Sequence, residues 1–421
     1  MRDAKTVLGI IQDRGRRGLP LEDVYRQLFN PDLYLRAYGR IYRNAGATTR
    51  RVTRETADGM SQEKIAAVID TLRWERYRWT RVRRVYIPKA HGNMRPLGVP
   101  TWRDKLLQEV IRSILEAYDE PQFSPLSHGF RPGRGCHTVL IQIHKTWTGT
   151  KWFIEGDLKG FFDNIDHTIM LSSLREKIHD ERFIRLISNL LEAGYVEEWP
   201  WRPTLSGTPQ GGIGSPILSN IYLDRFDQYV QSELIPAHTR GLRRQRPTEY
   251  RHVEYQLAKA RELGDREAIR QWQKTLCETP TYDYHDPTYT RLRYVRYADD
   301  FLLGFAGTKE EAGEIRAKIR NWLRGNLKLE LSEEKTLITH ATLGAARFLG
   351  YDVLAFRSEQ RPTVNGHIKL AIPVDIIRDA CHRYMRDEKP IHRPERINSA
   401  FERPALPVLP CRSRCLVRPN C

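Results

Sequence analysis

Residues 294–305 read YVRYADDFLLGF, two apolar stretches separated by Ala298, Asp299 and Asp300. Stretches rich in Tyr, Val, Phe and Leu on both sides of a short polar break predict a β-hairpin with two carboxylates at its tip. Adjacent carboxylates repel each other unless cations neutralise them. Because Asp is also common in solvated turns, the pair by itself does not establish a metal site.

A third carboxylate belongs to a separate predicted strand. Residues 152–158 read WFIEGDL, so Asp157 lies at the end of this strand. If the strand neighbours the hairpin in one sheet, Asp157 converges with Asp299 and Asp300. Mg²⁺ prefers carboxylate oxygens and takes few protein ligands beside substrate phosphates. Two such ions can hold the attacking and leaving oxygens of a phosphoryl transfer, so the three aspartates predict that chemistry.

The balance of charge favours a polyanionic partner. The 421 residues include 69 Lys and Arg against 52 Asp and Glu, a net charge of +17. Each phosphate that a basic surface neutralises releases condensed counterions, so this surplus favours nucleic acid. No apolar run reaches the roughly 18 residues of a membrane span, and residues 1–15 lack the apolar block of a signal peptide. We therefore expect a cytoplasmic protein without a membrane partner.

The chain changes character several times along its length. Residues 1 to about 70 have helical periodicity, and residues 81–100 alternate basic and apolar residues around a turn, which predicts a β-hairpin. A Gly-rich loop at 208–216 precedes another predicted helix. Residues 236–293 are polar and charged, with ten basic and five acidic side chains between residues 240 and 274. From about residue 398, repeated prolines replace any helical or strand period.

Several blocks of the chain resemble those of reverse transcriptases and follow the same order. YADD at residues 297–300 resembles the YxDD box of these enzymes. The other blocks match reverse transcriptases of bacterial group II introns over roughly residues 20–395, and the chain is identified as a member of this family. The blocks are IPKAHGNMRPL (87–97), SHGFRPGRG (127–135), GDLKGFFDNIDH (156–167), GTPQGGIGSP (207–216), LSEEKT (331–336) and FLGY (348–351).

The resemblance implies an α+β fold of fingers and palm, with an antiparallel palm sheet backed by helices. Residues 1–70 would form a helical N-terminal extension, and residues 71–354 the fingers and palm, with an insertion at about 236–293. Residues 355–421 would hold the start of a helical thumb and an irregular Pro-rich tail. Because this tail is unlike the thumb and maturase domain of the family, we expect a truncated, incomplete thumb.

The resemblance also assigns the catalytic centre. Asp157 and Asp299 match metal ligands, with the backbone carbonyl of Leu158 as a further ligand and Asp300 as a weaker one. The three aspartates would be the catalytic residues, and two Mg²⁺ ions the cofactor. Phe162 matches the aromatic residue whose ring excludes a ribose 2′-OH and so selects deoxynucleotides. Core packing is the alternative for Phe162, since another Phe precedes it.

The incoming nucleotide would meet two further regions. Lys89 and Arg95 lie in the predicted hairpin at 81–100, where the family binds the triphosphate, and charge-assisted contacts to phosphate suit both. A solvated edge strand is the alternative explanation of these two residues. Gln210 resembles a residue that contacts the nucleotide sugar or the template base, and Gly211 beside it allows close approach of the backbone.

Three more basic residues match positions at the nucleic acid or the leaving group. Lys335 matches a lysine proposed to assist the leaving pyrophosphate, with a solvated lysine as the alternative. Arg131 and Arg134 would contact the template–primer backbone, which positions the duplex without reading its sequence. The charged insertion at 236–293 would touch intron RNA, unless it is an ordinary charged helical surface.

The implied function is that of an RNA-directed DNA polymerase. Its substrates would be deoxynucleoside triphosphates, an RNA template and a DNA or RNA primer. Its partner would be the host group II intron RNA, whose splicing and mobility it would also assist. An RNA-binding, maturase-like splicing factor and an inactive truncated relic stay open as alternatives. Retron-type and diversity-generating reverse transcriptases are the nearest enzymatic rivals, which the match through the insertion and residues 389–394 disfavours.

Overall fold

The chain divides into two compact units, which we describe separately. The first holds Met1–Leu349 and Val353–Leu370, and the second Gly350–Asp352 and Ala371–Cys421. Among the described helices, none combines the length and the apolar character that crossing a membrane requires. The computed structural model describes residues 2–42, 56, 58–88, 94–196, 201–202, 212–283, 286–356, 366–382, 385–386 and 389–390.

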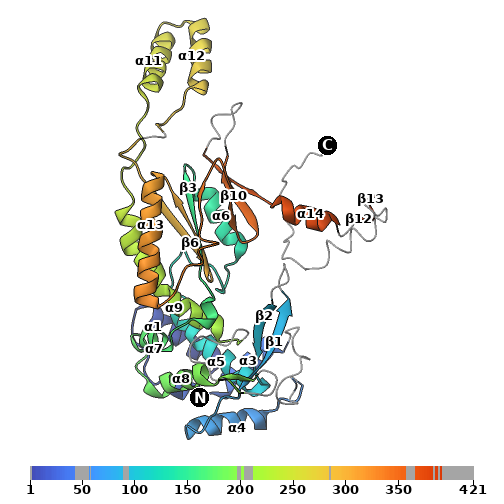
Figure 1. The fold of residues 1–421 in the computed structure, drawn as a ribbon. Helices are drawn as coiled ribbons and strands as arrows, with labels where there is room; N and C mark the ends of the chain where they lie inside the picture. The colour runs from blue at the N-terminus through green and yellow to red at the C-terminus, as the bar shows by residue number, and fades with distance from the viewer. Residues whose placement is uncertain are drawn as a thin grey trace. The chain divides into compact units, whose positions relative to one another are not determined.

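A four-stranded antiparallel sheet, called the central sheet below, forms the middle of the first unit (Figure 1). The hairpin predicted at 294–305 is present as its strands β6 and β7, and the strand predicted at 152–158 is β3, which pairs with β7. The α+β class is thereby confirmed. In order across the sheet the strands are β6 (Leu292–Tyr297), β7 (Asp300–Phe305), β3 (Trp152–Asp157) and β8 (Ile338–His340).

The two faces of the central sheet differ in what covers them. Successive side chains of a strand point to opposite faces. One face carries Gly156 and its register partner Phe301. On that face Phe226 of helix α9 (Ser215–Tyr229) packs 5.2 Å from Phe301, measured between ring centroids. On the opposite face, Trp147 stacks on Phe153 with a centroid distance of 6.4 Å. Helix α9 therefore supports the face away from the Asp157 side chain.

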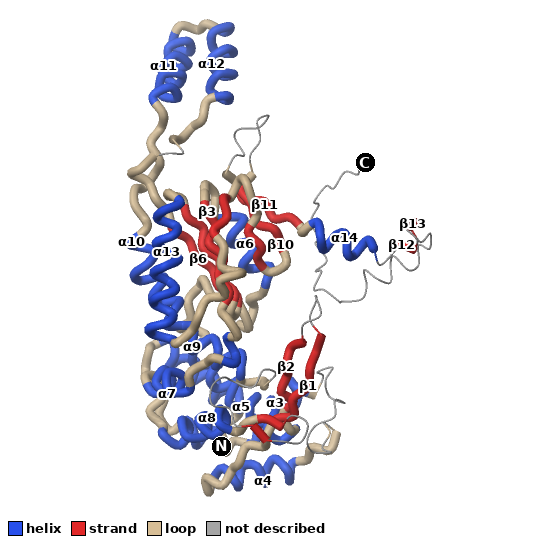
Figure 2. Tube along the Cα trace, viewed as in Figure 1, coloured by secondary structure: helices blue, strands red, loops and turns tan. Residues whose placement is uncertain are grey.

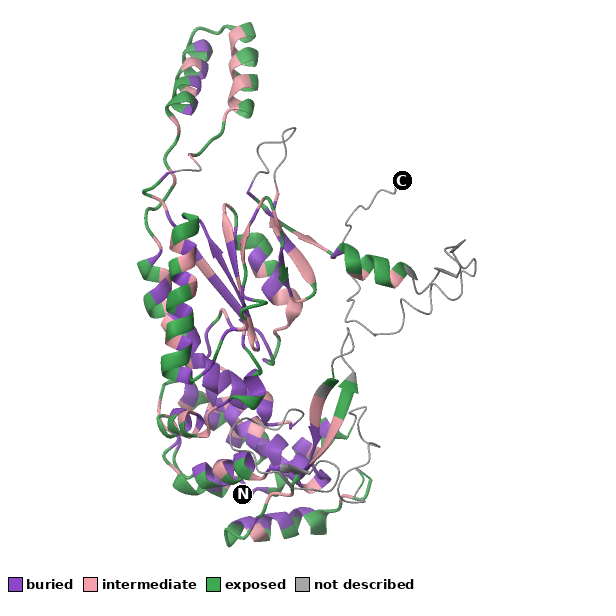
Figure 3. Ribbon diagram, viewed as in Figure 1, coloured by how far each residue is buried: buried purple, intermediate pink, exposed green. Residues whose placement is uncertain are grey.

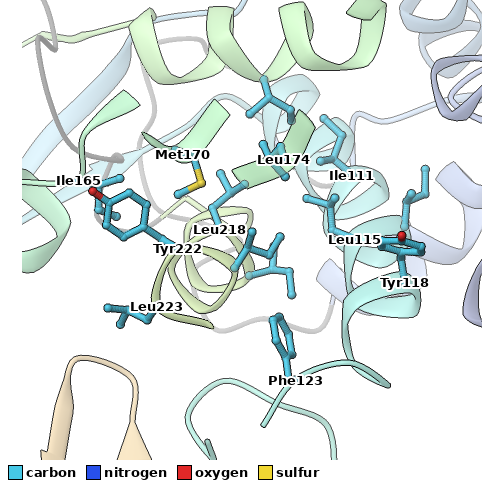
Figure 4. Close-up of a cluster of buried hydrophobic side chains, with 14 of the residues drawn as sticks. Ile111, Leu115, Tyr118, Phe123, Ile165, Met170, Leu174, Leu218, Tyr222 and Leu223 are labelled. Carbon is cyan, nitrogen blue, oxygen red and sulfur yellow. The ribbon is translucent and has the colours of Figure 1, made fainter. Parts of the chain in front are cut away.

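One large hydrophobic core joins the central sheet to most of the helices. Helix α5 (Trp102–Asp119) is buried on nearly all sides, and α9 is buried along most of its length (Figure 3). Figure 4 shows Ile111 and Leu115 of α5 in the same cluster as Met170 and Leu218. The core also takes in α1 (Ala4–Arg16), α2 (Val24–Gln27), α3 (Pro31–Ile41), α4 (Gln62–Arg73), α7 (His167–Arg175), α8 (Glu181–Glu192) and α13 (Lys309–Trp322). The four N-terminal helices thus share a core with the rest of the unit.

The helices begin where the sequence supplies capping side chains. Thr101 precedes α5 and accepts a hydrogen bond from the backbone N–H of Asp104. Thr308 and Glu311 form a reciprocal capping box at the start of α13. Helix α6 (Cys136–Thr146) follows the block at 127–135, and a short 3₁₀ turn (Phe161–Asp163) follows β3. The start of α6 therefore adjoins the block at 127–135, and the 3₁₀ turn lies within the block at 156–167.

A second four-stranded sheet contains the hairpin predicted at 81–100. Its order is β2 (Met94–Val99), β1 (Val82–Pro88), β4 (Tyr195–Val196) and β5 (Trp201–Arg202). The pairing of β1 with β2 is antiparallel, as a hairpin requires. The turn of this hairpin, residues 89–93, lies outside the described residues.

The charged insertion folds as helices. After α9, a π-helical turn (Val230–Leu234) and α10 (Ile235–Ala237) lead to α11 (Thr248–Glu262) and α12 (Arg266–Glu278). The last two pack against each other as a helical hairpin (Figure 2). Tyr250, Val253 and Leu257 are buried along α11, whereas the described side chains of α12 include none that is buried. Most of this hairpin is therefore a charged, exposed surface.

Few elements of the second unit are described. They are α14 (Val374–His382) and the paired two-residue strands β12 (Met385–Arg386) and β13 (Lys389–Pro390). The first unit ends in a small sheet of β9 (Ala346–Phe348), β10 (Tyr351–Ala355) and β11 (Ile368–Ala371), after a π-helical turn at Leu323–Leu327 that extends α13. The Pro-rich tail predicted from the sequence, beyond residue 390, lies outside the described residues.

A glycine substitution pair tests the packing of the central sheet. A Cβ added to Gly156 would overlap the ring of Phe301, whereas one added to Gly313 in α13 meets no atom within 4 Å. We predict that Gly156→Ala lowers the free energy of unfolding by about 1–3 kcal/mol through overpacking. The control Gly313→Ala should raise it by about 0.5–1 kcal/mol, because Ala suits a helix better than Gly. Urea unfolding measures both, and a Gly156→Ala variant as stable as the parent would contradict this packing.

Candidate active site

The three predicted aspartates meet at one end of the central sheet. Asp157 ends β3 and Asp300 begins β7, and the two are direct register partners across the antiparallel pair. Tyr297 and Asp300 are register partners in turn, so Ala298 and Asp299 form the two-residue tip of the hairpin. We call residues 297–300 the aspartate turn. Ala298 has φ of 56°, in the left-handed region that favours glycine.

Electrostatic repulsion perturbs this group. Burial raises the pKa of Asp300 to about 7, and the charges of Asp299 and Asp157 add to the effect together with a hydrogen bond to Asp157. A carboxyl group whose neighbours are carboxylates keeps its proton unless a cation is supplied. The arrangement is therefore chemically suited to binding cations.

One cation of the chain already contacts the group. The Nζ of Lys335 lies 3.1 Å from Oδ2 and 3.3 Å from Oδ1 of Asp157. The block at 331–336 reaches β3 through its backbone, because the N–H of Ser332 donates to the carbonyl of Asp157 at 2.9 Å. The Lys335 side chain is 67% exposed, so its ammonium can also move to another anion at this end of the sheet. This position agrees with a contact to a leaving pyrophosphate.

The residues fit a metal site that substrate completes. Among the described residues, no group of three or more His, Cys, Asp or Glu side chains forms a ready-made metal cage. The three aspartates share one end of the sheet, and their role as ligands of metal ions stays a prediction. Mg²⁺ needs only one or two carboxylates beside substrate phosphates, which this end provides. Leu158 follows β3 and is 3% exposed, so only its backbone could serve as a ligand.

Phe162 lies in the 3₁₀ turn that follows β3. Gly160 precedes this turn with φ of 55°, which redirects the chain after β3. Phe162 is 8% exposed and packs edge-on against Phe161, with ring centroids 5.2 Å apart. Phe161 is buried more deeply, at 2% exposed, and also packs against Tyr222. Both rings belong to the core, and Phe162 is the less deeply buried of the two.

Arg131, which we predicted to contact the template–primer backbone, has internal partners in the structure. Its guanidinium is buried, forms an ion pair with Glu120 at 2.9 Å and donates to the carbonyls of Ser124 and Ser127. These internal partners use the donors that a phosphate would need, so Arg131 fixes the loop before α6. Arg134 donates to the carbonyl of Pro125 but is only partly buried, which leaves a phosphate contact open to it.

The remaining nucleotide contacts fall at the limits of the described residues. Lys89, Gln210 and Gly211 lie outside them. Arg95 lies in β2 as the register partner of Ile87, but its side chain is not described. The hairpin predicted to carry Lys89 and Arg95 is present, and the roles of all four residues stay predictions.

Two residues at the aspartate turn were missed by sequence reasoning. A Cβ on Gly129 would overlap the backbone nitrogen of Ala298, so the block at 127–135 lies directly against the turn. Arg296 is 1% exposed although it is charged. Strand alternation could have found Arg296, because it places this residue on the same face as the apolar Tyr294.

Comparison with known proteins agrees with this geometry. Residues 87–259 match the family model "Reverse transcriptase (RNA-dependent DNA polymerase)". The chain is 36% identical over 311 residues to Protein YkfC of Escherichia coli (strain K12), which covers 71% of this chain and 74% of YkfC. The chain belongs to the reverse transcriptase family. It is also 40% identical over 402 residues, 89% of its length, to the group II intron-encoded protein LtrA of Lactococcus lactis subsp. cremoris, of which it spans 66%.

Solved structures give a more distant likeness. Telomerase from Candida tropicalis, in complex with a fragment of telomeric RNA, is 14% identical to this reverse transcriptase family member, with a TM-score of 0.42. The match covers 69% of this chain and 45% of the telomerase chain. We rest no argument on this similarity, because the score is low.

The pKa of Asp300 predicts how stability depends on pH without divalent cations. The folded pKa of about 7 lies above the ordinary 3.8, so the folded protein holds a proton that the unfolded chain releases. The stability that this carboxyl contributes is therefore lost as the pH rises from about 4 to about 7. Asp300→Asn removes the ionisation. In EDTA the variant should be more stable than the parent at pH 8, and the difference should shrink toward pH 5.

Urea unfolding at several pH values measures this difference. The control is Asp13→Asn in α1, whose carboxylate is 59% exposed. It should leave the stability nearly unchanged throughout, since exposed ion pairs contribute little. A stability difference between Asp300→Asn and the parent that stays the same from pH 5 to pH 8 would contradict the raised pKa of Asp300, which burial and the neighbouring carboxylates cause.

Proposed function

We propose that this protein is an RNA-directed DNA polymerase, which adds deoxynucleotides to a DNA or RNA primer along an RNA template. The observation that carries the proposal is the direct pairing of Asp157 with Asp300, with Asp299 at the tip between them. Such a concentration of carboxylates suits phosphoryl transfer with divalent ions. The net charge of +17 favours a nucleic-acid substrate. Membership of the reverse transcriptase family supports the same reaction.

The proposed cofactor is a pair of Mg²⁺ ions held by Asp157, Asp299, Asp300 and the backbone carbonyl of Leu158. When bound, the ions would activate the primer 3′-hydroxyl and neutralise the charge that develops on the leaving pyrophosphate. The Asp157 and Asp300 side chains lie on the face opposite the one covered by α9, at the end of the sheet where the substrate phosphates would bind. The Lys335 side chain would swing its ammonium group from Asp157 to the pyrophosphate as the pyrophosphate forms.

Selection and binding of the nucleotide involve residues on three elements. Phe162, the less buried residue of the Phe161–Phe162 pair, would exclude the 2′-OH of a ribonucleotide. Lys89 and Arg95 would bind the triphosphate, and Gln210 with Gly211 would meet the sugar or the template base. Arg134 remains our candidate for the template–primer backbone, and it keeps part of its surface exposed.

The proposed RNA partner is the host group II intron. The similarity to a protein named as group II intron-encoded supports this origin. Between residues 240 and 274 the insertion carries ten basic and five acidic side chains, and four of the basic ones (Arg240, Arg243, Arg244 and Arg246) precede α11. This basic segment before the mostly exposed α11–α12 hairpin suits an RNA surface. Assistance of splicing and mobility would use this contact. The cytoplasm, which supplies template RNA and nucleotides, is the location that we infer.

Loss of one aspartate tests the proposed reaction. We predict that Asp299→Asn reduces single-nucleotide extension of a primed RNA template by at least about a hundredfold, since loss of a metal ligand costs several kcal/mol of transition-state stabilisation. The affinity for primer–template should change little, because the basic surface supplies most of it. Asp13→Asn serves as the charge-matched control. Extension by Asp299→Asn at more than a tenth of the parent rate would exclude the assignment.

A pair of phenylalanine variants tests selection against ribonucleotides. We predict that Phe162→Ala raises the ratio of ribo- to deoxynucleotide incorporation efficiency by roughly tenfold or more, because the 2′-OH no longer meets a ring. Phe161→Leu is the control, since Phe161 lies in the core beside it and should change stability without changing the ratio. An unaltered ratio in Phe162→Ala would make Phe162 a core residue.

A further inference from the structure

A buried ion pair lies directly behind the aspartate turn. Arg296 of β6 is 1% exposed and Asp227 of α9 is fully buried. The Nε of Arg296 donates to Oδ1 of Asp227 at 2.8 Å, and one terminal nitrogen donates to Oδ2 at 2.6 Å. The hydroxyl of Tyr294 donates to the same Oδ1 at 2.8 Å. The carboxylate is therefore bound from two residues of β6, the strand that leads into the turn.

The other donors of Arg296 reach the turn and its neighbours. One terminal nitrogen donates to the backbone carbonyl of Ala298 at 2.8 Å and to Oδ1 of Asn220 at 3.2 Å. The other also donates to the hydroxyl of Ser127 at 2.9 Å. A guanidinium has five N–H groups, and these five hydrogen bonds use all of them. No lysine could make the same set of contacts.

A second set of contacts holds the turn from the block at 127–135. Asn220 donates from its amide to the carbonyl of Gly129 at 2.9 Å, and Gly129 lies so close to Ala298 that a Cβ would overlap its nitrogen. The backbone of Arg296 pairs with the same block, since its N–H donates to Leu126 and its carbonyl accepts from His128, both at 2.9 Å. Arg296 and Asn220 therefore hold Ala298 from its carbonyl side and its nitrogen side.

The turn needs such support for two physical reasons. Ala298 adopts the left-handed backbone that disfavours side chains with a Cβ, and such strain persists only where the surroundings fix it. Asp157 and Asp300 are also direct register partners with Asp299 at the tip beside them, and carboxylates this close repel one another when ionised. A buried ion pair adds little stability over apolar residues of equal volume, but its hydrogen bonds fix geometry.

We propose that Arg296 is a positioning residue of the metal site: ion-paired to Asp227, it holds the carbonyl of Ala298 and, with Asn220 and Gly129, keeps Asp299 and Asp300 placed to bind the ions. The proposal rests on the proposed metal-dependent function of the aspartate turn. It also links that turn to α9, the helix that follows the Gly-rich loop with Gln210 and Gly211. The rival explanation is that the ion pair merely contributes to the stability of the fold.

Two variants separate these explanations. Asn220→Ala removes the amide between Arg296 and Gly129 while it keeps the ion pair, so it is the milder change. Arg296→Lys keeps the charge but can supply at most three donors. The control is Arg112→Lys in α5, whose guanidinium is likewise paired, to Glu109 and Glu116, in a partly buried cluster. All three variants are studied as the full chain. Active-site titration counts the active molecules in each preparation, and rates are compared per active molecule.

The first measurement is hydrogen–deuterium exchange, which needs no reaction. We expect faster exchange in peptides covering 126–131 and 294–301 in Asn220→Ala and Arg296→Lys, with exchange in α5 unchanged. Arg112→Lys should speed exchange in α5 and leave exchange in the peptides covering 126–131 and 294–301 unchanged. General loosening of the whole central sheet, without a local change at the turn, would overturn the proposal.

The second measurement is single-turnover extension as a function of Mg²⁺ concentration. We expect the maximal rate per active molecule to fall by about tenfold or more, since small misplacement of reacting groups is costly, and the half-saturating Mg²⁺ concentration to rise about threefold or more. Primer–template affinity should stay within about twofold, because its phosphate contacts lie elsewhere. Variants that lose only stability, with the parent's Mg²⁺ dependence, would overturn the proposal. Failure of the proposed function would instead appear as a parent chain no more active than Asp299→Asn.

Discussion

The structure must hold carboxylates together on neighbouring strands although they repel each other, and this constraint shapes the rest of the fold. The pairing of β3 with β7 places Asp157 directly opposite Asp300, and the hairpin adds Asp299 at its tip. A shift of one residue in this register would send one carboxylate to the face covered by α9 and leave the other on the opposite face. The register must therefore be held by forces unrelated to the carboxylates themselves, because these oppose it.

The interior of the sheet supplies those forces. Gly156 leaves the space that the Phe301 ring fills, and Phe226 of α9 packs against the same ring. These contacts belong to the core that α5, α7 and α9 share with the N-terminal helices. Because side chains alternate along each strand, one face of β3, β6 and β7 is packed against α9, and the opposite face carries the acidic groups at its end. Both faces are packed, by Phe226 of α9 on one side and by Trp147 on the other, and the acidic groups lie at one end of the second face.

Local sequence patterns were enough to predict the hairpin at 294–305 and the strand ending in Asp157, because each depends on residues close in sequence. The adjacency of the two was only a condition of the sequence argument, since it depends on pairing between strands far apart in the chain. Local patterns were not enough for Arg131, whose partners Glu120 and Ser124 use a guanidinium that resembled a phosphate ligand. Strand alternation places Arg296 on the same face as Tyr294, but it could not identify the ion pair, because the partner Asp227 lies 69 residues away in sequence. Whether an arginine is a surface group or a structural one depends on which distant residues pack around it. Local periodicity in the sequence does not identify those residues.

The central claim is that the paired aspartates bind two divalent ions at the reacting nucleotide. Its most direct test is to count bound Mn²⁺ by electron paramagnetic resonance in a complex with a chain-terminated primer, an RNA template and the next deoxynucleotide. The account predicts about two tightly bound ions in the parent, close enough to couple, and loss of both from the double variant Asp157→Asn, Asp300→Asn. The same number of tightly bound ions in both proteins would contradict it.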